Sequence, residues 1–216
     1  MYTAEELIWA TQLAYCNFDE KDLENGKTIR EIVSEQGAKI YYNYKENATP
    51  TGDSKTMRDE TINFINAIKN GEICQNWKII SVYDRQDQEG TYGIMIDTGN
   101  DEAIIAFRGS ESVSTKQFVK DWLATDFEII NGTMSDQERA ACRYLDKIAN
   151  NKEFDKYQNI AVTGHSLGGD LALVSTIYTA TDECTTDMAS RIKQSVSMDG
   201  LGHPKAQKAM GEKLCS

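Results

Sequence analysis

The sequence predicts a single α/β domain, built on a mostly parallel β-sheet with helices on both of its faces. Two observations support this fold class. After Arg108, short apolar segments of strand length alternate with segments of helical periodicity, and this alternation is typical of parallel strands covered on both faces. The chain has 216 residues, of which 40% are hydrophobic and 26% charged, which is enough for one domain with its own core.

Residues 1–76 are expected to form a mainly helical N-terminal region. Two capping boxes, Thr3–Glu6 and Thr28–Glu31, place a hydroxyl three residues before a glutamate, and each predicts the start of a helix. A third helix is predicted over Ser54–Asn70, where apolar residues recur on one face.

Residues 77–216 are expected to contain the sheet. Three β-rich segments separated by polar turns predict an antiparallel meander: Trp77–Tyr83, Thr91–Ile96 and Ala103–Phe107. The turn Asp84–Gly90 would join the first two strands. The expected continuation is a helix capped by Ser135 and Glu138, a strand over Asn159–Thr163, a helix over Leu167–Ala180, and a strand over Ser195–Met198.

The segment Gly164-His-Ser-Leu-Gly-Gly169 fits the G-x-S-x-G pattern, in which a serine stands on a tight turn from a strand to a helix. The glycines lack Cβ atoms, which lets the turn close and lets the helix approach the strand. The predicted strand before the segment and the predicted helix after it are what this motif requires. We therefore predict Ser166 as a catalytic nucleophile; the alternative is a glycine-rich turn with an incidental serine.

A serine nucleophile needs a base, an acid that orients the base, and donors aimed at the developing oxyanion. The backbone N–H of Leu167 is predicted to supply one donor, because it follows the nucleophile. Ser110, in the loop after the strand Ala103–Phe107, is predicted to supply the second; the alternative is an ordinary loop. The loss of one such donor typically raises the barrier by roughly 3–4 kcal/mol.

Several segments in this order resemble the class 3 (fungal-lipase-like) lipases. They are Phe107-Arg-Gly-Ser110, Asp121-Trp-Leu123 and the segment around Ser166, while Leu13–Phe18 is similar to the N-terminal helix of that family. Ser197-Met-Asp-Gly-Leu-Gly202 is similar to a segment of a bacterial subgroup, the Mbeg-like lipase-like proteins. The resemblance covers about residues 1–202. It implies an α/β-hydrolase fold without a cofactor, and hydrolysis of a small acyl ester or lipid substrate.

The two histidines, His165 and His203, decide whether a triad can form within this chain. His165 lies inside the motif beside the nucleophile, and we assign it a structural role near the oxyanion loop. In this fold the chain order is Ser, then Asp or Glu, then His, so Asp199 and His203 are the candidate acid and base. The alternatives are a turn aspartate and a locally hydrogen-bonded histidine.

Few residues follow Asp199, so the chain is expected to lack the last strands of the fold. A base beyond Ser216 is therefore the other candidate for the proton transfer.

Composition excludes several function classes. The formal net charge of −11 argues against nucleic acid, which is bound by Lys and Arg side chains, and against an anionic lipid surface. The five cysteines have no metal-ligand spacing, so no metal is expected. Two of them, Cys16 and Cys142, are predicted to lie on helices as small buried hydrophobes.

Localisation follows from what the sequence does not contain. No apolar stretch is long enough to span a bilayer, and no signal peptide is recognisable. These features favour a cytoplasmic location without an integral membrane segment, with export by a signal-less route as the alternative. The sequence does not determine the oligomeric state.

The sequence thus predicts a serine hydrolase of carboxylic esters that acts through an acyl-enzyme on Ser166. The alternative is a catalytically inactive or incomplete hydrolase-like domain that binds an acyl ligand or a partner. A peptidase or thioesterase would use the same chemistry.

Overall fold

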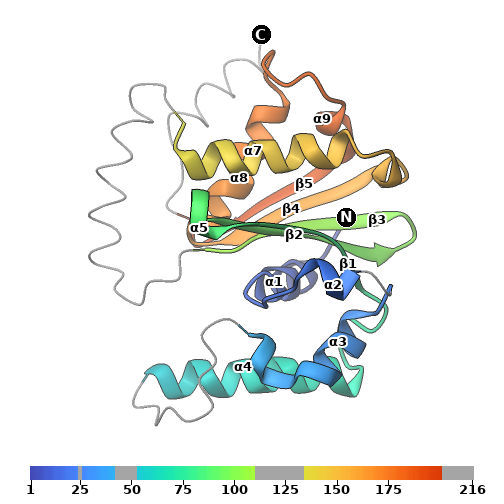
Figure 1. Ribbon diagram of the computed structural model, residues 1–216, viewed down its shortest axis with the longest axis vertical. Helices are drawn as coiled ribbons and strands as arrows, with labels where there is room; N and C mark the ends of the chain where they lie inside the picture. The colour runs from blue at the N-terminus through green and yellow to red at the C-terminus, as the bar shows by residue number, and fades with distance from the viewer. Residues whose placement is uncertain (24–25, 42–52, 110–133, 201–216) are drawn as a thin grey trace.

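The computed structural model describes residues 1–23, 26–41, 53–109 and 134–200, which form helices around one five-stranded sheet (Figure 1). The strands lie in the order in which they occur in the chain. They are β1 (Lys78–Arg85), β2 (Thr91–Gly99), β3 (Glu102–Phe107), β4 (Asn159–His165) and β5 (Ile192–Met198).

The sheet is mixed, but four of its five strands run in the same direction, in keeping with the mostly parallel sheet that the sequence predicted. β1, β2 and β3 pair antiparallel, and β3, β4 and β5 pair parallel. The reason lies in the connections. Short turns return the chain beside the strand that it has just left, and this gives antiparallel pairs, while parallel pairs need a longer crossover. The expected meander accounts for the antiparallel half.

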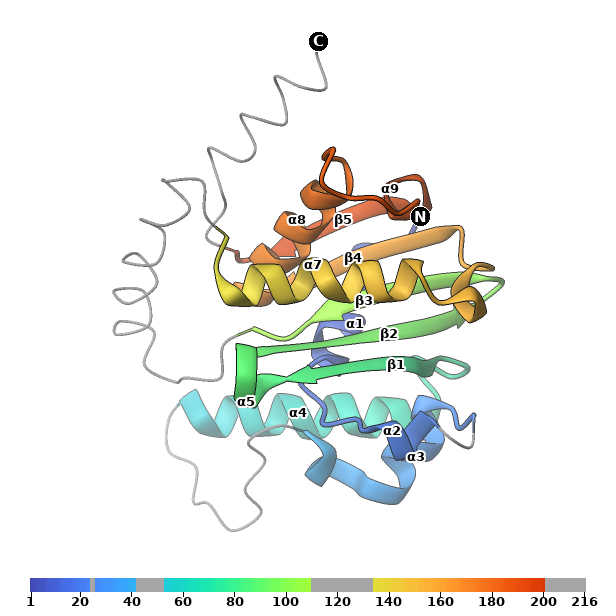
Figure 2. The same ribbon diagram turned by 45° about the horizontal axis from the view of Figure 1, so that its top comes forward.

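Helices cover both faces of the sheet, as the sequence predicted. Figure 1 shows α7 (Asp136–Ala149), α8 (Leu167–Thr179) and α9 (Met188–Arg191) above the sheet and α1 (Ala4–Leu13) beneath it. Below α1 lie α3 (Ile29–Gln36) and α4 (Asp53–Asn70). In the turned view of Figure 2, the strands follow one another from β5 to β1, and α7 runs in front of the sheet, roughly along the strands. The short helices are α2 (Glu20–Leu23), α5 (Gln86–Glu89), η1 (Gly37–Ile40) and η2 (Lys152–Phe154).

The strands divide the core into two hydrophobic clusters because successive side chains point to opposite faces of a sheet. In β2, Ile94 and Ile96 belong to the cluster between the sheet and α1, and Met95 belongs to the cluster between the sheet and the helices α7 and α8. In β3, Ile104 and Ile105 divide in the same way. Both faces of these central strands are therefore buried.

All three capping boxes form as predicted. The hydroxyls of Thr3, Thr28 and Ser135 accept hydrogen bonds from the backbone N–H three residues on, and the glutamate at that position accepts one in return. Two local predictions were wrong. β1 continues to Arg85, and one helical turn, α5, replaces most of the expected polar turn before Gly90.

The other wrong prediction placed Cys16 on a helix. α1 ends at Leu13, and the chain then leaves the helix, so Cys16 forms an isolated antiparallel bridge with Tyr41. Cys16 is nevertheless fully buried, as expected. Within the described ranges, no helix combines the length and apolar character that crossing a membrane requires.

Candidate functional site

Ser166 stands at the bend between β4 and α8 in a backbone conformation that few residues adopt. Its φ is 54° and its ψ is −127°, a region that carries strain for any residue with a Cβ atom. Ser166 is the N-cap of α8, yet its side chain makes no capping hydrogen bond. Serine is a preferred N-cap residue. Because this half-buried hydroxyl makes no capping bond, it is available for other contacts.

The glycines on either side let backbone segments approach one another at the bend. A Cβ atom on Gly164 would lie 2.2 Å from the carbonyl oxygen of Gly168. A Cβ atom on Gly168 would lie 2.3 Å from the carbonyl oxygen of Phe107, in β3. Because real Cβ atoms do not come so close to backbone oxygens, a side chain at either position would push α8 away from the strands that hold it.

The end of β3 also comes close to Ser166. Gly109 is buried, and a Cβ atom built on it would lie 3.5 Å from the Cβ of Ser166 and 2.5 Å from the carbonyl oxygen of His165. Arg108 fixes this stretch, because its guanidinium donates to the carbonyl oxygens of Ala14 (2.7 Å) and Cys16 (2.9 Å). The chain that leads into Ser110 therefore passes directly beside the proposed nucleophile.

β5 ends beside the same bend. The N–H of Ser166 donates to the carbonyl oxygen of Met198 at 2.8 Å, and His165 pairs with Met198 in the parallel register. Asp199, the next residue, has a φ of 49° and a side chain that is 91% exposed. Its carboxylate lies 3.8 Å from Nε2 of His165.

His165 is exposed, and it contacts groups from three parts of the chain. Its Nδ1 lies 3.3 Å from the hydroxyl of Tyr15, and its Nε2 faces Asp199. Its carbonyl oxygen would lie 2.5 Å from a Cβ atom built on Gly109. These contacts agree with a structural role for this histidine beside the loop that follows β3.

The first turn of α8 buries a carboxylate, that of Asp170, which is 1% exposed. A negative charge is favourable at this place because the helix dipole and the unpaired N–H groups of the first turn are positive. Asp170 also faces the chain after β5, since a Cβ atom on Gly200 would lie 2.8 Å from its Oδ1. This buried acid therefore lies between the start of α8 and the turn that carries Asp199.

The structure places three of the five predicted site residues together. Ser166 and Leu167 form the bend itself, and Asp199 follows the neighbouring strand. Ser110 and His203 lie outside the described residues, so their predicted roles stay predictions. The sequence reasoning missed Tyr15 and Asp170, because nothing in their local pattern shows that they meet the bend after Gly164.

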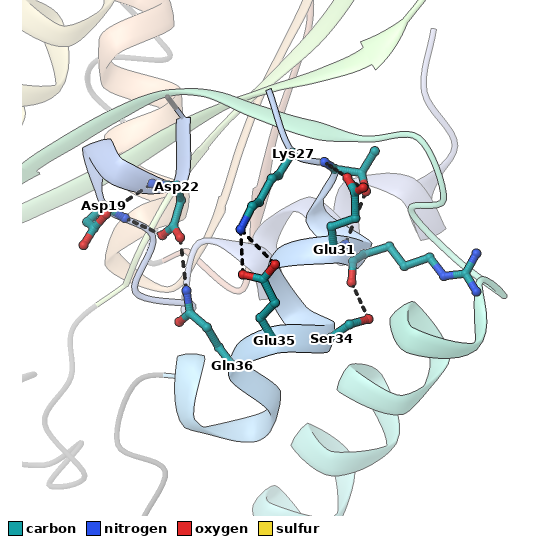
Figure 3. Close-up of polar contacts among 9 residues, drawn as sticks. Asp19, Asp22, Lys27, Glu31, Ser34, Glu35 and Gln36 are labelled. Atoms are coloured by element: carbon teal, nitrogen blue, oxygen red, sulfur yellow. Dashed lines mark hydrogen bonds and ion pairs between the residues drawn. The ribbon is translucent and has the colours of Figure 1, made fainter. Parts of the chain in front are cut away.

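A second candidate is an open depression of about 440 Å³ on the other side of the molecule, beside α3. Figure 3 shows that two of its glutamates, Glu31 and Glu35, make polar contacts with their neighbours. Lys27 pairs with Glu35 at 2.7 Å, and Glu31 caps its own helix. Beside it, the side-chain amide of Gln36 donates to Asp22. The hydrogen bonds from Thr28 lower the pKa of Glu31, which keeps the cap charged and occupied. This depression therefore offers no reactive group.

The described part of the chain contains no cluster of three His, Cys, Asp or Glu side chains that would suit a metal ion.

A family model described as Mbeg1-like matches residues 47–212, which include the bend and both neighbouring strands. No curated protein and no solved structure matches the chain.

Proposed function

The chain belongs to the Mbeg1-like family, and we propose that it is a serine hydrolase of carboxylic esters with an α/β-hydrolase-like fold. The observation that carries the proposal is the conformation of Ser166. Its φ of 54° holds a non-capping hydroxyl at the N-terminus of α8. A strained conformation of this kind persists where the surrounding structure enforces it, and such positions cluster at active sites.

The proposed reaction proceeds through an acyl-enzyme. Oγ of Ser166 attacks the ester carbonyl carbon, its proton passes to a base, and the carbonyl electron pair moves onto oxygen. Collapse of this intermediate breaks the bond to the alcohol, which leaves with that proton. Water then attacks the acyl-enzyme in the same manner and releases the acid. His203 is our candidate for the base, and Asp199 for the carboxylate that orients it.

Two backbone regions support stabilisation of the oxyanion. The N–H of Leu167 is in the first turn of α8, where the helix itself supplies no acceptor. Gly109 brings the chain before Ser110 against Ser166, which supports our prediction that Ser110 supplies the second donor. Fixed donors of this kind act on charge that develops in the transition state, and they need no reorganisation when it forms.

A fluorophosphonate probe tests the proposal, because it reacts only with an activated serine. We expect labelling of the wild-type chain at Ser166 and none in Ser166→Ala. Ser190→Ala is the matched control, since Ser190 is exposed in α9 and its hydroxyl donates to the carbonyl oxygen of Asp187; this variant should be labelled like the wild type. In His203→Ala, labelling should be strongly weakened.

Absence of labelling in a folded wild-type sample would contradict the proposal. That outcome favours the alternative of an inactive hydrolase-like domain that binds an acyl ligand or a partner. If labelling occurs, hydrolysis of short and long acyl esters in parallel with thioesters and peptides identifies the substrate class. We expect the acyl esters, of small or lipid-like character, to be preferred.

A further inference from the structure

The segment after α1 is fastened to the chain beside the nucleophile. Arg108, one residue before Gly109, donates to the backbone carbonyls of Ala14 and Cys16 and to the side chain of Asn17 at 3.0 Å. Arg108 is 3% exposed, and its guanidinium carbon lies 3.9 Å from the centroid of the Tyr92 ring. Because these contacts are buried and charge-assisted, residues 14–17 are held rigidly against the end of β3.

Within that segment, the hydroxyl of Tyr15 reaches the bend. A Cβ atom built on Gly109 would lie 2.5 Å from this hydroxyl, 2.5 Å from the carbonyl oxygen of His165 and 3.5 Å from the Cβ of Ser166. All three groups therefore border one methyl-sized volume. The same hydroxyl lies 3.3 Å from Nδ1 of His165, so it contacts both the backbone after β3 and the residue before the nucleophile.

The ring of Tyr15 is held from two sides. It stacks on Tyr41, with 6.3 Å between the ring centroids and 20° between the planes, and it meets the imidazole of His165 at 6.5 Å. The backbone is fixed as well, because Asn17 donates to Ile40 at 2.7 Å. A ring confined in this way keeps its hydroxyl in one place without a further loss of side-chain entropy.

The carboxylate of Asp199 favours one of the two neutral forms of the imidazole. It lies 3.8 Å from Nε2 of His165 and is 91% exposed, and its charge favours the form that carries the proton on Nε2. Nδ1 is then an acceptor, and the hydroxyl of Tyr15 donates to it. The contacts run in series from Tyr15 through His165 to Asp199, and they pass beside Ser166.

We propose that Tyr15 is a positioning residue of the hydrolase site, whose hydroxyl holds the imidazole of His165 and the backbone at Gly109 at a fixed separation from Ser166. The inference rests on the proposed function. It adds to the site a residue that lies before the range matched by the family model. A misplacement of about 1 Å at a reacting centre can lower the rate roughly 10²-fold, so even a small relaxation of this contact is measurable.

The test is Tyr15→Phe, which keeps the ring and removes the hydroxyl. We expect kcat for a p-nitrophenyl ester of a short acid to fall about 10-fold, with KM within about 2-fold, because the change affects the transition state and not ground-state binding. The rate of labelling by the fluorophosphonate should fall in parallel. Tyr178→Phe is the matched control, because it removes a hydroxyl that donates to Asp146 near the last turn of α8, at the opposite end of the helix from Ser166, and should leave kcat unchanged.

A double-mutant cycle provides a readout that a merely structural role would not move. If the hydroxyl acts through the imidazole, Tyr15→Phe should have a smaller effect in a His165→Ala background than in the wild type. The thermal midpoint of Tyr15→Phe should stay close to that of Tyr178→Phe, which also loses one tyrosine hydroxyl.

Four results would overturn the positioning role while the proposed function stands. They are an unchanged kcat in Tyr15→Phe, a rise in KM alone, a loss of folding that accounts for the lost activity, and additive effects in the cycle. A folded wild-type chain with neither labelling nor esterase activity would overturn the proposed function, and this inference with it.

Discussion

The backbone of Ser166 shows a conflict between stability and chemistry at a single residue. With a φ of 54° and a ψ of −127°, the Cβ atom imposes strain of about 1–3 kcal/mol that glycine would largely avoid. The hydroxyl also forgoes the capping bond that a serine usually makes. Both features lower the stability of the fold, so they are best explained by a reaction that needs the hydroxyl in this place.

This strain predicts that Ser166→Gly stabilises the protein while it abolishes the proposed activity. We expect the free energy of unfolding to rise by about 1 kcal/mol, since glycine relieves the strain but adds entropy to the unfolded chain. Urea denaturation measures the change, with Ser166→Ala as the control because alanine keeps the Cβ atom. Equal stability of the glycine and alanine variants would show that the bend stores no strain.

The sequence predicted which residue stands at the bend but not the contacts around it. The glycine spacing around Ser166 indicated a tight turn, because only residues without a Cβ atom allow α8 to approach β3. The approach of Tyr15 to Gly109 joins residues 94 positions apart, and no local pattern encodes such a contact. Tertiary proximity therefore has to be observed.

At the scale of elements, Arg108 is the residue that joins the N-terminal segment to the sheet. It also donates to Oε1 of Gln86 at 3.1 Å, in α5, so one buried side chain fastens two connections to the end of β3. The sequence identified Arg108 through a family resemblance, without a structural reason for it. The structure supplies the reason: the nitrogens of the guanidinium donate to backbone carbonyl oxygens that follow α1.

Arg108→Lys tests this fastening. Lysine keeps the charge, but its single nitrogen cannot reach all the oxygens that the guanidinium serves, and a buried acceptor left unsatisfied costs about 1–3 kcal/mol. We expect the free energy of unfolding to fall by roughly 2–4 kcal/mol in urea. Arg85→Lys, at the exposed end of β1, should change it by less than about 0.5 kcal/mol. If both variants lost the same small amount, the fork would be dispensable.

Most helices and strands were predictable from the sequence because their signals are local. Capping boxes at Thr3, Thr28 and Ser135 predicted the helix starts that the structure shows. The end of α1 was not predictable in this way. The segment after Leu13 leaves the helix to bond with Arg108 and Tyr41, and these partners lie far away in the sequence. Tertiary contacts overrode local helical preference there.

At the scale of the whole molecule, the two-sided sheet buries three thiols in the two layers of the core. Burial raises the pKa of Cys16, Cys74 and Cys142 to about 12 in each case. Cys16 and Cys74 belong to the cluster between the sheet and α1, and Cys142 lies on α7 on the opposite face. The sequence predicted burial for Cys16 and Cys142, as small hydrophobes on helices, and both are buried; the layer that each one occupies depends on contacts far apart in the chain.

These shifts predict a loss of stability at alkaline pH. An unfolded cysteine ionises near pH 8.5, whereas the folded thiols hold their protons until about pH 12. Between these values the unfolded chain binds fewer protons than the folded one, so the free energy of unfolding decreases as pH rises. The stabilisation is fully present below pH 8.5 and is lost as pH rises toward 12. Urea midpoints at pH 8.0, 9.0 and 9.5 measure the decrease, to which unfolded tyrosines, with an ordinary pKa near 10, add increasingly toward pH 9.5.

Cys142→Ala separates the thiol effect from general alkaline damage. With one titrating group removed, the decrease in the free energy of unfolding between pH 8.0 and 9.5 should become shallower, whatever the variant does to stability at neutral pH. Alkylation of the folded wild type with iodoacetamide at pH 8.0 gives an independent check, because Cys16, Cys74 and Cys142 should resist modification as buried neutral thiols. Equal slopes in the two proteins, together with rapid alkylation of these three residues, would mean that the core opens in solution. The two layers would then not stay closed around the sheet, and the rigid support that we infer for Ser166 would be missing.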